Sequence, residues 1–91
     1  MNQGGDRTEK KRRAGEFAAD LVEDGMVVGL GTGTTAGFAI DALGDAVEAG
    51  LDITAIPTSY QSRARALSAG LTLTELDAVD RVDIAIDGAD Q

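Results

Sequence analysis

Short apolar runs that alternate with helical patterns constrain the fold of this chain more than any other feature. The run 26–30 has no alternation of polar and apolar residues, which is typical of a strand buried on both faces of a sheet. Three further runs, at 53–57, 71–73 and 82–86, also predict strands. Segments with helical character lie between the first three runs. This order of elements predicts an α/β fold, with a Rossmann-like parallel sheet and flanking helices.

A helix is expected before the first strand. It is predicted to begin at Asp6, which has capping-box spacing to Glu9, and to end at Gly25. Residues 1–5 are expected to be a disordered start. Apolar residues recur at helical spacing and predict the buried face of this helix, which consists of Ala14, Phe17, Ala18, Leu21 and Val22.

Two more helices are predicted over 36–50 and 59–69. The chain then stops directly after the run 82–86, at a turn rich in Gly and Asp, although a further helix and strand normally follow in such a fold. We therefore expect residues 6–91 to be the N-terminal portion of a longer domain, with an incomplete sheet.

The absence of His and Cys from the 91 residues excludes several site chemistries, namely disulfides, Cys/His zinc sites and Ser-His-Asp triads. The charge is uneven, because residues 1–13 carry a net +3 and residues 14–91 a net −11. Such an acidic body is expected to repel nucleic acid and anionic membranes, and its Asp-rich balance indicates a salt-adapted protein. No apolar run approaches bilayer length and no signal peptide is visible, so a cytoplasmic protein is predicted.

A glycine-rich turn, Gly29-Leu-Gly-Thr-Gly-Thr-Thr35, lies between a predicted strand and a predicted helix. Glycines let the backbone approach an anion closely, and a helix N-terminus offers unpaired N–H groups and a positive dipole end. The turn is therefore predicted to bind phosphate, and the alternative is a tight turn with Thr as the helix N-cap. The Lys of a Walker A loop is missing. A dinucleotide site is disfavoured, because Asp52 lies at the beginning of its strand rather than at the end.

Two acids, Asp87 and Asp90, flank Gly88 and Ala89 directly after the last apolar run, and Asp83 precedes them. Ligands of parallel α/β folds bind at the carboxyl ends of the strands. This position favours a carboxylate pair that hydrogen-bonds a polyol or assists proton transfer. A divalent cation bound by oxygens and a solvated acidic turn are the open alternatives.

The basic segment 10–13 lies on the first predicted helix, beside Glu9 and Glu16. A solvated helix face is favoured over nucleic-acid contact, since the run is short and has acids next to it. Contact between one of these cations and a phosphate at the glycine-rich turn is the alternative.

Four segments form a specific combination, which is Gly29-Leu-Gly-Thr-Gly-Thr-Thr-Ala36, Pro57-Thr-Ser59, Gly70-Leu-Thr-Leu73 and Asp83-Ile-Ala-Ile-Asp-Gly-Ala-Asp90. From about Lys11 to its last residue, the chain resembles the type A ribose-5-phosphate isomerases. The resemblance implies interconversion of ribose 5-phosphate and ribulose 5-phosphate through an enediolate, in the non-oxidative branch of the pentose phosphate pathway. It implies no metal or other cofactor, and a dimer or tetramer for the complete protein.

The resemblance also implies roles for individual residues. It gives ring opening and substrate positioning to Asp87 and Asp90. The residues that it places at the substrate are Lys11, Thr32, Gly33, Thr34, Thr35, Asp87, Gly88, Ala89 and Asp90.

The family's catalytic base is a Glu that follows a Lys-Gly-Gly-Gly motif, and neither occurs in these 91 residues. Gln91 also replaces the Glu that usually follows the Asp-Gly-Ala-Asp motif. Isomerisation needs a base within hydrogen-bond reach of the proton that moves between C2 and C1, so we expect the 91-residue chain to be inactive on its own. The alternatives are a non-catalytic sugar-phosphate sensor of the same superfamily and a dinucleotide-binding half-domain.

Overall fold

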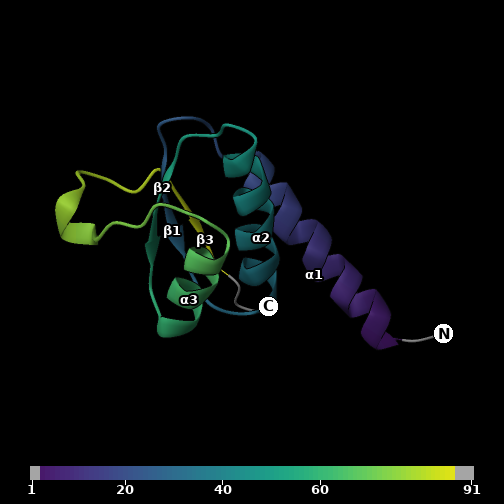
Figure 1. Cartoon of the computed structure of the whole chain (residues 1–91). Coiled ribbons are helices and arrows are strands. Elements are labelled where there is room, and N and C mark those ends of the chain that lie inside the picture. Colours follow the sequence, from purple (N-terminus) through teal and green to yellow (C-terminus); the bar gives the residue numbers. More distant parts are fainter. Residues whose placement is uncertain (1–2, 88–91) are drawn as a thin grey trace.

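The computed structural model describes residues 3–87. Its centre is a three-stranded sheet in the order β2-β1-β3, in which both pairings are parallel. The strands are β1 (Val27–Leu30), β2 (Thr54–Pro57) and β3 (Ile84–Ile86). The predicted Rossmann-like parallel sheet with flanking helices is confirmed (Figure 1).

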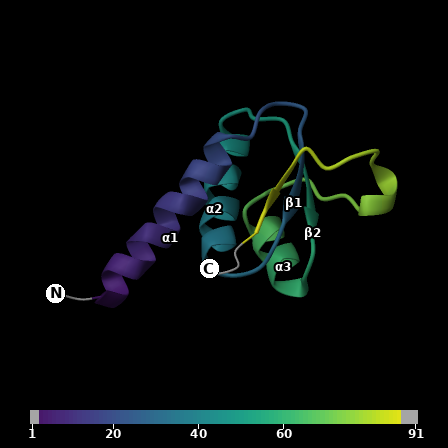
Figure 2. The same cartoon turned by 180° about the vertical axis from the view of Figure 1, so that it is seen from behind.

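Three helices pack on one side of the sheet, and they are α1 (Gln3–Asp20), α2 (Thr34–Glu48) and α3 (Tyr60–Ser68). The short helix η1 (Leu76–Ala78) lies on the other side, within the connection from α3 to β3 (Figures 1 and 2). The core lies between the sheet and the helices, and its largest fully buried side chains are Val28, Leu30, Ile40 and Leu43.

The predicted bounds of the first helix are wrong at both ends. Helix α1 begins at Gln3, so residues 3–5 form its first turn, and Asp6 lies inside the helix instead of capping it. The helix ends at Asp20 because the amides of Leu21 and Val22 each bond to a carbonyl three residues earlier, which tightens the last turn.

The predicted buried face of α1 is also partly wrong. Phe17 and Leu21 are 65% and 51% exposed. Ala14 is exposed as well, whereas the prediction is confirmed for Val22, which is buried. Gly15 and Ala19 are also buried, although the apolar pattern did not include them. The physical reason is that α1 and α2 approach so closely at Gly15 that a large side chain has no room between them.

The predicted strand 71–73 is reduced to a single bridge. Leu73 pairs with Ala55 of β2, and backbone hydrogen bonds at Thr72 and Thr74 flank that pair. The chain then turns away toward η1, so this run adds one bridge to the edge of the sheet instead of a fourth full strand.

Candidate functional site

The carboxyl end of β1 is tied to both neighbouring strands. The carbonyl oxygen of Leu30 accepts hydrogen bonds from the Thr58 amide at 3.1 Å and from Thr58 Oγ1 at 2.8 Å. On the other side, the Gly31 amide donates to the Ile86 carbonyl at 2.8 Å. The start of the glycine-rich turn is therefore held in place by hydrogen bonds on the β2 side and on the β3 side.

Gly33 is the N-cap of α2, so the alternative in which a Thr caps this helix is wrong. Its φ of 103° lies in the left-handed region, which a residue with a side chain rarely adopts. Gly33 supplies no side-chain cap, and the Gly37 amide makes a helical bond to its carbonyl at 3.0 Å. The amides of residues 34–36 precede that bond and point out of the helix N-terminus, which is the arrangement that binds anions.

Three threonines belong to this turn. Thr32 and Thr34 are exposed, and Thr35 is half-buried. The turn therefore places three threonines at the positive end of the α2 dipole, and phosphate binding there stays a prediction.

Asp87 lies directly against the turn. A Cβ added to Gly31 would be 3.1 Å from the Ile86 carbonyl oxygen and 3.2 Å from Asp87 Oδ1. Such contacts are tighter than side chains normally make, so a glycine at this position lets β3 and Asp87 come this close. The structure thus brings Asp87 next to the glycine-rich turn, while Gly88, Ala89 and Asp90 lie outside the described residues.

Asp83 has a different place from Asp87. It precedes β3, at the amino ends of the parallel strands, where its Oδ2 accepts a hydrogen bond from the Val27 amide at 2.7 Å. Its Oδ1 accepts from Arg81 Nε, also at 2.7 Å. Two hydrogen-bond donors lower the pKa of Asp83. The Arg81 guanidinium has the larger effect and the Val27 N–H the smaller one. This acid anchors the start of two strands.

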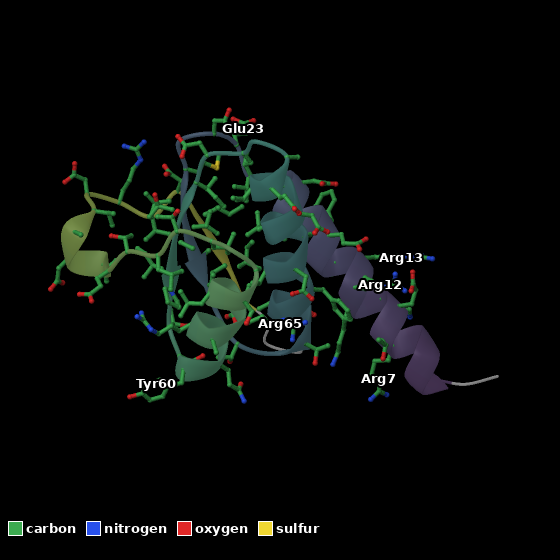
Figure 3. All side chains as sticks on the ribbon, viewed as in Figure 1. Arg7, Arg12, Arg13, Glu23, Tyr60 and Arg65 are labelled. Atoms are coloured by element: carbon green, nitrogen blue, oxygen red, sulfur yellow. The ribbon has the colours of Figure 1, made fainter. Side chains whose placement is uncertain are left out.

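The basic segment divides into two parts. Arg12 and Arg13 both pair with Glu9 on the exposed side of α1 (Figure 3), as expected for a solvated helix face. Lys11 is half-buried and lies one turn before Gly15, on the side of α1 that packs on α2. Lys11 is thus on the helix face that leads to the glycine-rich turn.

A groove of about 820 Å³ runs between α2 and α3, and the glycine-rich turn lines one end of it. Arg65 lines the groove, bonds bidentately to Asp41 at 2.7 and 3.2 Å, and rests on Gly37 (Figure 3). Hydrogen bonding of the Arg65 guanidinium to the Asp41 carboxylate raises the pKa of Arg65. The Arg65–Asp41 pair was missed by sequence reasoning, because the two residues are 24 positions apart and share no local pattern.

Thr58 belongs to the motif Pro57-Thr-Ser59, which by itself assigns this residue no role. The signal that finds it is its position, since it follows β2 directly, at the carboxyl edge of a parallel sheet.

None of the helices among residues 3–87 combines the length and the apolar character that a membrane crossing needs.

Sequence comparison relates the chain to one family. The family model of ribose 5-phosphate isomerase A (phosphoriboisomerase A) matches residues 54–91. Ribose-5-phosphate isomerase A of Haloquadratum walsbyi is 58% identical over 91 residues, which is 100% of this chain and 39% of that protein. The Natronomonas pharaonis protein of the same name is 60% identical, again over the whole chain and over 40% of its own length. The chain thus spans about two fifths of the length of these curated relatives.

Comparison with solved structures relates the chain to the same family. A D-ribose-5-phosphate isomerase in complex with phospho-erythronic acid superposes with a TM-score of 0.83 at 41% identity, over 87% of this chain and 35% of that one. Ribose 5-phosphate isomerase A from Methanocaldococcus jannaschii gives a TM-score of 0.80 at 44% identity, over 85% of this chain and 34% of that one. By sequence over all its residues and by fold, the chain belongs to the ribose-5-phosphate isomerase A family.

Proposed function

We propose that this chain forms the sugar-phosphate-binding part of an isomerase that interconverts ribose 5-phosphate and ribulose 5-phosphate. The observation that carries the proposal is the meeting of the glycine-rich turn with Asp87, across the contact between Gly31 and the end of β3. A phosphate site and a carboxylate then lie side by side at one edge of the sheet. The relative captured with phospho-erythronic acid, a phosphorylated sugar acid, supports a sugar phosphate as the ligand.

In this proposal, the phosphate group binds at the N-terminus of α2. The amides of residues 34–36 and the hydroxyls of Thr32, Thr34 and Thr35 donate to its oxygens. Lys11 adds a positive charge from α1. Local donors of this kind are needed, because the protein has a net charge of −8 and its general field opposes a phosphate dianion.

The sugar extends from the phosphate toward Asp87. The carboxylate of Asp87 accepts hydrogen bonds from sugar hydroxyls and takes part in the proton movements that open the furanose ring. Asp90 has the same assignment, from the family motif. Transfer of a proton from C2 to C1 is the task of the family's Glu, which is absent from these 91 residues.

A sugar-phosphate sensor of the same superfamily is the second candidate function. It would use the same turn and the same Asp87 without turnover, so binding alone does not separate the two functions. A dinucleotide site stays disfavoured, because the end of β2 carries Thr58 in place of an acid, and the Thr58 hydroxyl is engaged with the Leu30 carbonyl.

Calorimetric titration of the 91-residue chain tests the proposal. Ribose 5-phosphate should bind more tightly than ribose or inorganic phosphate, because only it fills both halves of the site, and NAD should not bind. Thr34→Val should weaken ribose 5-phosphate binding about tenfold, the cost of one hydrogen bond to a charged group. Thr72→Val, at an exposed threonine outside the turn, is the matched control. Equal affinity for ribose and ribose 5-phosphate would contradict the proposal.

A turnover assay tests the assignment of the base. The same chain should form no ribulose 5-phosphate above the uncatalysed rate, although it binds ribose 5-phosphate. Measurable isomerisation would show that a group within these residues replaces the family's Glu.

A cytoplasmic location, a homo-oligomeric state and the absence of nucleic-acid and membrane partners stay predictions. Salt adaptation, inferred from the Asp-rich composition, fits the relatives from Haloquadratum walsbyi, Natronomonas pharaonis and Haloarcula marismortui.

A further inference from the structure

Helices α1 and α2 approach each other closely at Gly15. A Cβ added there would lie 2.6 Å from the Thr35 carbonyl oxygen and 2.8 Å from the Ala39 amide nitrogen. Both atoms belong to the backbone of α2, so a side-chain movement cannot relieve the contact. Ala is a better helix former than Gly, so glycine at this mid-helix position fits a packing requirement better than a local preference.

The contact lies at the site end of α2. Thr35 is the second residue of that helix and the last residue of the glycine-rich turn. Helices α1 and α2 run in the same general direction but cross at an angle, so that α1 leans away from α2 toward its own N-terminus (Figures 1 and 2). One turn before Gly15, and therefore about 6 Å closer to the N-terminus of α1, lies Lys11. It is half-buried, whereas Lys10 and Arg12 are exposed.

The shared general direction of the two helices determines toward which end of α2 Lys11 lies. Gly15 contacts α2 at Thr35, and Lys11 lies one turn earlier on α1, toward the end of α2 at which the glycine-rich turn lies. A contact between two backbones therefore sets the distance between a lysine on one helix and the phosphate-binding amides on the next.

We propose that Gly15 is a positioning residue, which sets the spacing between Lys11 and the glycine-rich turn so that the lysine can reach a phosphate bound there. The proposal rests on the proposed function. A side chain on Gly15 requires the helices to separate by about 0.8 Å, which takes the 2.6 Å contact to an ordinary 3.4 Å. Charge-assisted hydrogen bonds have a narrow range of lengths, so a shift of this size is enough to weaken one.

Gly44 offers a matched control. It lies near the other end of α2, ten residues after Thr34 and about 15 Å along the helix. A Cβ there would be 2.7 Å from the Ala69 carbonyl oxygen and 2.8 Å from Ala69 Cβ. Gly44→Ala therefore forces α2 from α3 by a similar amount, away from Lys11 and the turn.

The test is calorimetric titration of the 91-residue chain with ribose 5-phosphate, together with thermal unfolding of each variant. Gly15→Ala should weaken binding about tenfold, the effect of losing one charge-assisted contact. Gly44→Ala should change the Kd less than twofold, although both variants melt at lower temperature. Equal loss of affinity in the two variants would overturn the proposal.

A double-mutant cycle separates positioning from a general loss of structure. If Gly15 acts through Lys11, then Gly15→Ala should have little further effect on the Kd in a Lys11→Met background. The same tenfold loss in both backgrounds would contradict the proposal.

Two further outcomes are decisive. If Gly15→Ala does not fold, Lys11→Met alone is the test, because it keeps Gly15 and an unbranched side chain. It should weaken binding of ribose 5-phosphate, and an unchanged Kd would overturn the proposal. If the unsubstituted chain does not bind ribose 5-phosphate at all, the proposed function itself is wrong. Binding that is unaffected by Gly15→Ala overturns the positioning role alone.

Discussion

Carboxylates lie at both ends of the parallel strands, the amino ends (here the amino edge of the sheet) and the carboxyl ends (the carboxyl edge). Their surroundings differ between the two. At the amino edge, Asp83 accepts a hydrogen bond from the amide of Val27 at 2.7 Å, and Asp24 accepts one from the amide of Asp52 at 2.8 Å. These acids satisfy backbone donors beside the beginnings of strands, which is a structural role.

At the carboxyl edge, the backbone groups that need partners are carbonyls. The Leu30 and Ile86 oxygens accept from Thr58 and Gly31, which are donors, and a carboxylate cannot take that role. Asp87 instead lies beside the glycine-rich turn. Asp83 and Asp87, four residues apart in the sequence, are therefore separated by the length of β3, about 13 Å, and we assign them different roles.

Replacing each of the two acids, Asp83 and Asp87, by its amide should show most clearly whether their roles differ. In the proposed site the Asp87 carboxylate holds sugar hydroxyls, so we expect Asp87→Asn to raise the Kd for ribose 5-phosphate about 10- to 100-fold. Its melting temperature should change by less than about 2 °C, in the range of ordinary surface substitutions. Calorimetry and thermal unfolding measure the two effects.

Asp83→Asn is the matched control, with the opposite expectation. It should lower the melting temperature, because the pairing with Arg81 is lost, and leave the Kd unchanged. The reverse pattern, with binding lost at Asp83 and stability lost at Asp87, would contradict the division between the edges.

A smaller effect is expected at Thr58. Thr58→Val keeps the shape of the side chain and removes the 2.8 Å bond from Oγ1 to the Leu30 carbonyl. The variant should lose about 1 kcal/mol of unfolding free energy in urea, and ribose 5-phosphate binding should weaken a few-fold because the base of the turn is loosened. Thr58→Ser should restore both properties, and failure of the serine to do so would show that the methyl group matters instead.

The smallest effect is the acid dependence of stability. Because Arg81 and the Val27 N–H lower the pKa of Asp83 in the folded protein, this acid stabilises the fold fully above its ordinary value of 3.8. The contribution should disappear as the pH falls below that value and through the lowered pKa. Urea unfolding between pH 5 and pH 2 should therefore show a shallower acid decline for Asp83→Asn than for the parent. Parallel declines would indicate that Asp83 is not linked to folding.

Much of the fold follows from the sequence, because β1, β2, α2 and α3 have strong local signals. The exposed Phe17 and Leu21 show where such signals fail. Periodicity detects large apolar residues, whereas the true contact of α1 is made through the absence of a side chain at Gly15, and that depends on the backbone of α2.

The candidate site likewise has features that the sequence predicts and features that it does not. The meeting of the glycine-rich turn with Asp87 could be predicted, since both follow strands and the carboxyl ends of parallel strands share one edge. The bonds of Thr58 to Leu30 and the Arg65–Asp41 pair could not be predicted, because each joins residues from different elements with no repeating pattern.

The most direct test of the central claim is an amide NMR titration of the 91-residue chain with ribose 5-phosphate. We expect saturable shifts at the amides of Thr32–Thr35 and at Asp87, with the amides of Asp52 and Asp83 at the opposite edge unchanged. Shifts confined to the amino edge, or spread evenly over the sheet, would contradict a sugar-phosphate site at the carboxyl ends of β1 and β3.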